Sequence, residues 1–320
     1  MKKLLTVFLA LFAQFAVFSS ASAKSETIAP DTIIKEHLRQ YGPQEMFSAI
    51  QVSIKVQDKI STYTAGNRSL EPGSKAISAD DLFDIGSITK SFTAAIAVMA
   101  ESEGKFKLEN GLNHYLPDYP HWGQLSLSGL LNMSTGIPNY SDAPRMNYLM
   151  SKNLRQYWNQ SDLINLVYSK QLNPPLKPGY FYSNTGYVLM DIILSKAYKT
   201  SFKNLLSSKI LTPLKLQNTF YPLPDYPVEV LQRLVRGYSY NVYDNPELLG
   251  KDVTENNLSW AGAAGALVAN SEDVIHWIEH LFIDDQLLTS AQKGKCKPSS
   301  LSRQVPHWLK RMQKPHRVLV

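Results

Sequence analysis

Ser87 and Lys90 are the residues of this 320-residue chain whose types and spacing best suit nucleophilic chemistry. They fit the pattern S-x-x-K, and residues three apart share one face of a helix, so the Lys90 ammonium can reach the Ser87 hydroxyl. A helix N-terminus offers free backbone N–H groups that stabilise a developing oxyanion. Gly86, directly before Ser87, permits a tight backbone turn into this helix. The pattern is short, however. Ser290 and Lys293 match it as well, and a helix-capping serine beside a solvated lysine has the same spacing.

Tyr182-Ser183-Asn184 is the second candidate for chemistry. Residues 178–179 (Pro-Gly) predict a sharp turn before Tyr182, and residues 185–187 lead into an apolar helix, so the triplet lies on a short loop held at both ends. A free phenol has a pKa of about 10, so a basic tyrosine needs a neighbouring cation, which Lys90 could supply. A buried structural tyrosine is the alternative. Two further Y-x-N triplets begin at Tyr157 and Tyr243.

The elements that must position these side chains are partly visible in the sequence. Apolar and polar residues alternate over 50–56, which indicates a strand with one face buried, and residues 60–65 are the expected returning strand of an antiparallel hairpin. Residues 87–103 are rich in helix-compatible types, and Gly104 is the expected stop. Further helices are predicted over residues 163–168 and 186–199 and from Ser271 onward.

The composition is that of an ordinary globular chain, with 44% hydrophobic and 19% charged residues. It excludes collagen, coiled coil and wholesale disorder, and allows one large domain or two small ones. The formal charge is +6, but residues 291–320 hold eight Lys or Arg and no acid, and residues 24–290 have a net charge of −4. Residues 24–290 therefore lack the excess of positive charge that is typical of a nucleic-acid-binding domain.

The N-terminus has the features of a targeting segment. Lys2 and Lys3 precede an apolar run over residues 4–18 and an Ala-Ser-Ala triplet at 21–23, so we predict a signal peptide over 1–23 and a periplasmic or secreted protein. The apolar run is short for a membrane span, and no cysteine near the cleavage site offers a lipid anchor; an uncleaved anchor is the alternative. Cys296 is the single cysteine, which excludes an intrachain disulfide and a cysteine-based metal site.

Six sequence blocks follow one another around these candidates: Phe83–Ala94, Leu130–Pro138, Pro178–Tyr187, Pro213–Thr219, Arg236–Tyr238 and Ala264–Asp273. In this order they resemble the class C β-lactamase family, which also contains penicillin-binding D,D-carboxypeptidases, D-aminopeptidases and serine esterases. The similarity spans roughly residues 45–290. Six ordered blocks are far more specific than either short motif alone.

The resemblance implies an α+β fold of the β-lactamase/transpeptidase type, with an antiparallel sheet flanked by helices and a mostly helical insertion at about 105–250. It implies that Ser87 is the acylated nucleophile and that its backbone N–H is one oxyanion donor. Lys90 would be the electrostatic partner and proton shuttle, and Tyr182 the general base and then the acid to the leaving group. Asn184 would hold the substrate's amide or carbonyl. The implied reaction is acyl transfer to serine followed by hydrolysis of a D-Ala peptide, a β-lactam or a small ester, with no metal or organic cofactor.

One family motif has no match. The third motif, K-T-G or H-x-G on a strand, is absent from residues 250–320, and Lys293-Gly294-Lys295 is the nearest sequence. We therefore expect residues 24–292 to form an incomplete domain without its C-terminal strands, and residues 293–320 to be an atypical basic tail, disordered or translated out of frame. The alternative function is non-catalytic: a truncated relic, or a binding module that keeps the pocket. Substrate and oligomeric state stay open.

Overall fold

The computed structural model describes residues 29–171, 173, 176, 179–240 and 245–296. The predicted signal peptide, and the predicted tail beyond Cys296, lie outside these residues. The helices and strands are α2 (Pro30–Glu45), β1 (Ala49–Val56), β2 (Lys59–Gly66), β3 (Phe83–Asp84), α3 (Thr89–Ser102), α4 (Leu127–Leu131), α5 (Pro144–Lys152), α6 (Gln160–Asn165), α7 (Thr185–Tyr198), α8 (Phe202–Leu206), β4 (Thr219–Phe220), α9 (Val228–Leu231), β5 (Val268–Ala269), α10 (Ser271–Phe282) and α11 (Ser290–Cys296).

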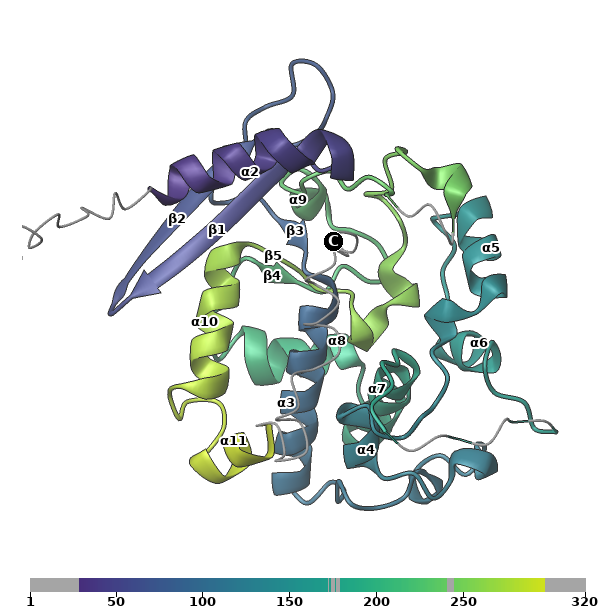
Figure 1. Ribbon diagram of the computed structural model, residues 1–320. Coiled ribbons are helices and arrows are strands. Elements are labelled where there is room, and N and C mark those ends of the chain that lie inside the picture. The colour runs from purple at the N-terminus through teal and green to yellow at the C-terminus, as the bar shows by residue number, and fades with distance from the viewer. Residues whose placement is uncertain (1–28, 172, 174–175, 177–178, 241–244, 297–320) are drawn as a thin grey trace, which may run out of the picture.

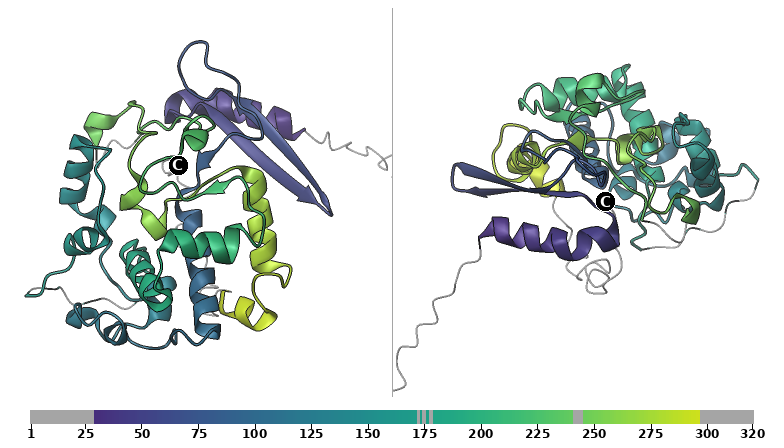
Figure 2. Two further views of the ribbon diagram at one scale, coloured as in Figure 1. Left: turned by 180° about the vertical axis from the view of Figure 1, so that it is seen from behind. Right: turned by 90° about the horizontal axis from the view of Figure 1, so that it is seen from above.

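β1 and β2 form the predicted antiparallel hairpin, with Val52 opposite Tyr63. Helices α2 and α10 lie on opposite faces of it (Figure 2). On the α10 side, Ser53 Oγ lies 2.7 Å from Ser271 Oγ, and Lys55 forms an ion pair of 2.5 Å with Glu279. The polar face of β1 therefore packs on the body of the protein.

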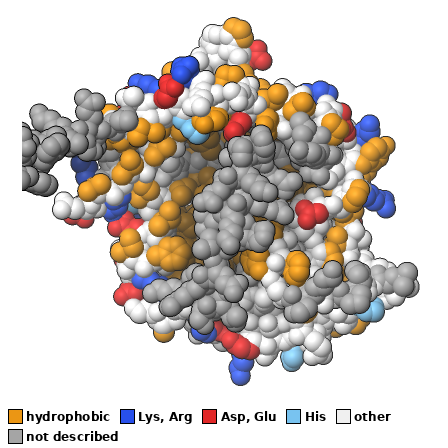
Figure 3. Space-filling model, viewed as in Figure 1, with side chains coloured by type: hydrophobic (Ala, Val, Ile, Leu, Met, Phe, Trp, Pro, Cys, Tyr) orange, Lys and Arg blue, Asp and Glu red, His pale blue; other side chains and the backbone are white. Residues whose placement is uncertain are grey.

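The expectation that the alternating apolar residues of β1 form a buried face is wrong at the end of the strand. Ile54 is 38% exposed and Val56 is 66% exposed. Exposed apolar side chains also occur at the end of α10, where Phe282 and Ile283 are 49% and 74% exposed. Figure 3 shows apolar side chains along the hairpin and α10 on this side of the molecule. Alternation identifies the two faces of a strand but not which face the rest of the chain covers.

A second small sheet, in the order β3-β5-β4 with antiparallel pairs, leads directly to the Ser87 region. Beyond β3, the Ile85 N–H still donates to the Leu267 carbonyl at 2.9 Å. Helix α3 then runs through the middle of the molecule between α10 on one side and α4 and α7 on the other (Figure 1). The family resemblance implies one antiparallel sheet flanked by helices, and the described residues form two small antiparallel sheets with helices around them.

The core is built around α3 and α7. The Phe92 and Trp277 rings stack at 3.8 Å between centroids, which joins α3 to α10. Val188, Leu189 and Ile193 of α7 lie in the same apolar cluster, and every residue of this helix from Thr185 to Asp191 is buried. The α3 end of this core is therefore rigidly packed, which restricts the movement of the Ser87 turn.

In the segment at 105–250, the described residues form short helices joined by long loops, with β4 as the strand among them, so much of the predicted helical insertion is loop. Helix α6 begins at Gln160, earlier than the expected 163, and α7 agrees with its predicted range to within one residue. At the C-terminal boundary, Lys293 lies inside α11 and forms an ion pair of 2.9 Å with Asp285. The segment predicted as a tail therefore begins within a helix.

None of the helices in the described part of the chain combines the length and the apolar composition required to cross a bilayer.

Candidate active site

Ser87 lies in a 3₁₀ turn, Gly86–Ile88, between β3 and α3. Gly86 has φ +49°, and a Cβ placed there would meet nothing within 4 Å. The glycine is therefore required for its backbone conformation and not for space. Thr89 holds the turn in place, because its Oγ1 donates to the Gly86 carbonyl at 2.7 Å and accepts from the Leu267 N–H at 3.1 Å. These bonds tie the turn to the second sheet and leave the Ser87 side chain exposed.

Lys90 occupies the first turn of α3 and is only 6% exposed. Its Nζ donates to Ser87 Oγ at 3.0 Å and to the Ala264 carbonyl at 2.7 Å. The same nitrogen lies 4.8 Å from the ring centroid of Tyr182 and 5.4 Å from that of Tyr187. Burial lowers the pKa of Lys90 to about 7, because the charged ammonium is poorly solvated. A neutral amine is therefore well populated near neutral pH.

Tyr182 is the third member of the group formed with Ser87 and Lys90. Its hydroxyl lies 2.5 Å from Ser87 Oγ, and its side chain is partly exposed. Burial raises the pKa of the Tyr182 phenol, and the hydrogen bond with Ser87 only partly opposes this effect. The resting tyrosine is therefore protonated, and Lys90 is the better proton acceptor. The structure brings Ser87, Lys90 and Tyr182 into direct contact, as the sequence predicted.

Asn184 lies close to the group but makes different contacts. Its side-chain Nδ2 donates to Ser141 Oγ at 3.0 Å, and its backbone N–H donates to Asn139 Oδ1 at 3.0 Å. The residue is 9% exposed. In the described part of the chain, the side chain of Asn184 therefore hydrogen-bonds to the neighbouring loop, and no hydrogen bond to Ser87 or Lys90 is seen.

Residues 139–142 form this neighbouring loop, and the sequence reasoning missed their role. The Tyr140 N–H donates to Thr185 Oγ1 at 3.1 Å, and Thr185 Oγ1 donates to the Pro138 carbonyl at 2.7 Å. The block Leu130–Pro138 ends one residue before this segment. The polar residues that follow Pro138 are the feature of the sequence that could have indicated this role. A sequence does not show, however, that two segments 45 residues apart are hydrogen-bonded to each other.

A cleft of about 400 Å³ opens beside Tyr182. It is lined by Gly136, Ile137, Pro138, Asn139, Asp142, Ala143, Val167, Phe181 and Tyr182. Because Tyr182 is hydrogen-bonded to Ser87, a molecule bound there lies next to the candidate nucleophile.

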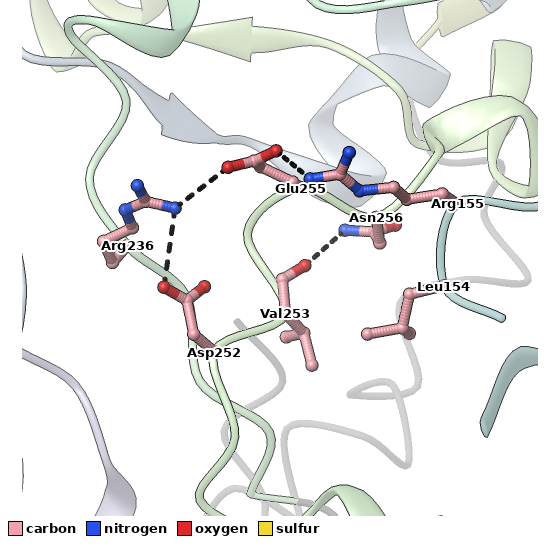
Figure 4. A pocket seen from close by; sticks show the side chains of 7 residues that line it. All are labelled: Leu154, Arg155, Arg236, Asp252, Val253, Glu255 and Asn256. Atoms are coloured by element: carbon pink, nitrogen blue, oxygen red, sulfur yellow. Dashed lines mark hydrogen bonds and ion pairs between the residues drawn. The ribbon is translucent and has the colours of Figure 1, made fainter. Parts of the chain in front are cut away.

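A second, smaller cleft of about 240 Å³ contains none of the predicted site residues (Figure 4). Arg236 lies 3.5 Å from Asp252 and 3.4 Å from Glu255, and Arg155 pairs with Glu255. These charged side chains pair with one another in an exposed network of ion pairs. We therefore interpret this cleft as a surface feature of the fold and not as a candidate active site.

The competing motif at Ser290 has no such geometry. Ser290 Oγ and Lys293 Nζ both contact Asp285, at 3.4 and 2.9 Å. Lys293 is therefore engaged in an ion pair. Within the described ranges, no group of three or more His, Cys, Asp or Glu side chains is placed to hold a metal ion.

Comparison with known proteins agrees with this geometry. Residues 34–313 match the family model described as Beta-lactamase. The chain is 24% identical over 234 residues to "Penicillin-binding protein 4*" of Bacillus subtilis, covering 71% of this chain and 51% of the relative. It is 26% identical over 255 residues to a beta-lactamase of Providencia stuartii, covering 78% and 58%. The chain thus spans about half the length of these curated relatives.

Solved structures show the same fold. The D-amino acid amidase from Ochrobactrum anthropi SV3 matches with a TM-score of 0.68 at 24% identity, covering 83% of this chain and 73% of that one. The octameric penicillin-binding protein homologue from Pyrococcus abyssi matches with a TM-score of 0.69 at 21% identity, covering 85% and 60%. The family match covers most of the chain and contains Ser87, Lys90 and Tyr182, so the protein belongs to the beta-lactamase family.

Proposed function

We propose that this protein is an exported serine hydrolase that forms an acyl-enzyme on Ser87. The observation that carries the proposal is the position of Ser87 Oγ, which lies 3.0 Å from Lys90 Nζ and 2.5 Å from the Tyr182 hydroxyl. A hydroxyl in contact with both an amine and a phenol has a proton acceptor and a proton donor for acyl transfer. The proposed substrates are a D-Ala peptide, a β-lactam, a D-amino acid amide or a small ester.

In the first step, Ser87 Oγ attacks the substrate's carbonyl carbon and its proton passes to neutral Lys90. The lowered pKa of Lys90 favours this direction, and the raised pKa of Tyr182 disfavours a phenolate base. This differs from the role of Tyr182 as base that the family resemblance implies. The backbone N–H of Ser87 is the proposed oxyanion donor.

In the second step, the tetrahedral intermediate collapses and the Tyr182 hydroxyl donates its proton to the leaving amine or alkoxide. Lys90, now protonated, returns its proton to the Tyr182 phenolate, so both groups regain their starting states. Water then hydrolyses the ester on Ser87: Lys90 accepts a proton from the attacking water and returns it to Ser87 Oγ as the carboxylic acid product departs. Asn184 is the proposed contact for the substrate's amide or carbonyl group.

The names of the relatives support this choice of substrates, since they include a penicillin-binding protein, beta-lactamases and a D-amino acid amidase. The predicted signal peptide supports export to the periplasm or secretion. The partner is thus a small molecule or a peptidoglycan peptide. No metal or organic cofactor takes part in the proposed steps.

The test is hydrolysis of benzylpenicillin, a D-amino acid amide and p-nitrophenyl acetate by the wild-type chain and by Ser87→Ala. Because the proposal assigns all turnover to Ser87, each activity present in the wild type should disappear in the variant. Turnover that survives in Ser87→Ala would overturn the proposal. A folded wild-type chain that turns over none of the three and forms no adduct would instead favour the alternative of a binding module without chemistry.

A further inference from the structure

Tyr187 is a buried aromatic residue beside the reactive group that the proposed steps do not use. It lies in the first turn of α7 and is 4% exposed. Lys90 Nζ lies over its ring, 5.4 Å from the centroid, and also over the ring of Tyr182, 4.8 Å from that centroid. Both distances fall within the range of about 6 Å over which a ring face attracts a cation. The amine that contacts Ser87 therefore has two aromatic faces beside it.

The ring of Tyr187 is held firmly in this position. Its hydroxyl donates to the Leu131 carbonyl at 2.8 Å, which joins α7 to the end of α4. Its side chain also packs in an apolar cluster with Met133 and Ala264. The Ala264 carbonyl in turn accepts a hydrogen bond from Lys90 Nζ at 2.7 Å. The segments that fix the ring therefore also fix the amine.

The groups that contact Lys90 Nζ among the described residues carry no charge. They are Ser87 Oγ, the Ala264 carbonyl and the two phenols. The lowered pKa of Lys90 has burial as its cause, with no carboxylate to oppose it. Burial raises the pKa of both phenols, so each is neutral at rest near pH 7. Without an anion nearby, a ring face is one of the few groups that can stabilise a positive charge on Lys90.

We propose that Tyr187 is a positioning residue for acylation, and that the face of its ring stabilises the ammonium ion formed when Lys90 takes the proton of Ser87. The inference rests on the proposed function, since it assigns a further residue to the same reaction. The attraction between a cation and a ring is strongest where water is excluded, as it is around Lys90. The hydroxyl of Tyr187 holds the ring in place and takes no part in the proton transfer.

The test replaces Tyr187 with rings that attract a cation less and less. Tyr187→Phe keeps the ring and removes the hydroxyl. Difluorophenylalanine and trifluorophenylalanine at the same position keep nearly the same shape but withdraw electron density from the ring face. Tyr187→Leu removes the ring and keeps the site apolar. Tyr198→Leu is the matched control, because Tyr198 lies at the other end of α7 and its ring is 4.8 Å from Lys209 Nζ.

The pKa of Lys90 is measured in two ways. The first is the pH midpoint of kcat/KM for p-nitrophenyl acetate. The second requires no turnover: the protein is isotope-labelled at the lysine ε-carbon, and the resonance of Lys90 is titrated by NMR. This resonance is identified as the one that is missing from Lys90→Ala.

We expect Tyr187→Phe to keep the wild-type midpoint, and the fluorinated rings to lower it stepwise, because the ammonium ion loses its stabilisation. Tyr187→Leu should lower the midpoint by about half a pH unit. It should also reduce the rate above the midpoint by about two- to threefold. Tyr198→Leu should leave both values unchanged. Loss of the hydrogen bond to Leu131 should reduce stability equally in the three phenylalanine variants, so stability cannot explain a difference among them.

The same Lys90 midpoint in all three phenylalanine variants, or a midpoint that rises on fluorination, would overturn the inference. An equal shift in Tyr198→Leu would overturn it as well. The comparison of the three rings remains valid if Tyr187→Leu fails to fold. If esters acylate Ser87 but the NMR titration shows no shift, the inference alone fails. If no ester reacts with Ser87, the proposed function fails, and the role of Tyr187 in acylation fails with it.

Discussion

The Ser87 and Tyr182 hydroxyl oxygens lie 2.5 Å apart although 95 positions separate the two residues in the chain. Ser87 is positioned by a turn tied to the second sheet, and Tyr182 by a loop that leads into α7. The helices α3 and α7 pack against each other, so the contact depends on the folded core.

The pH profile of acylation should report the ionisation of Lys90. Burial lowers the pKa of Lys90 to about 7, and the proposed mechanism requires the neutral amine. Values of kcat/KM for p-nitrophenyl acetate should therefore rise about tenfold per pH unit below pH 7 and level off above it. Stopped-flow measurement between pH 5 and 9, corrected for spontaneous hydrolysis, provides the profile. A rate that continues to rise towards pH 10 would show that Lys90 keeps an ordinary pKa.

Lys90 and Tyr182 should act as one unit in proton transfer. Lys90→Ala and Tyr182→Phe should each lower the acylation rate by at least about a hundredfold, and the double variant should be scarcely slower than either single variant. The double-mutant cycle is measured from single-turnover rates. Losses that simply multiply would mean that the two side chains act independently.

Gly86→Ala tests the backbone of the nucleophile turn. Since φ at Gly86 is +49° and a Cβ would meet nothing within 4 Å, the cost should be conformational only, about 1–2 kcal/mol in the free energy of unfolding. Gly237→Ala is the matched control: a Cβ there also meets nothing within 4 Å, but its φ lies outside the left-handed region. The control should change stability by less than about 0.5 kcal/mol. Equal losses in urea unfolding would remove the argument for strain at Gly86.

The sequence is enough to predict that Ser87, Lys90 and Tyr182 come together, but not how the loops around them are arranged. The S-x-x-K spacing places Ser87 and Lys90 on one side of a turn by local geometry, and the ordered blocks add Tyr182. The hydrogen bonds of Asn139 and Ser141 with Asn184 depend on how two loops pack, which local patterns do not encode. The hairpin illustrates the same limit, because alternation predicted the strand but not that Ser53 and Lys55 would face α10.

The central claim is that Ser87 becomes acylated, and peptide mapping tests it most directly. The protein is incubated with benzylpenicillin and with p-nitrophenyl esters, quenched in acid and digested, and the peptide that contains Ser87 is examined by mass spectrometry. The account predicts the mass of one acyl group on Ser87 in the wild type, a much smaller yield in Lys90→Ala, and none in Ser87→Ala. An adduct on another residue, or an adduct of equal yield in Ser87→Ala, would contradict it.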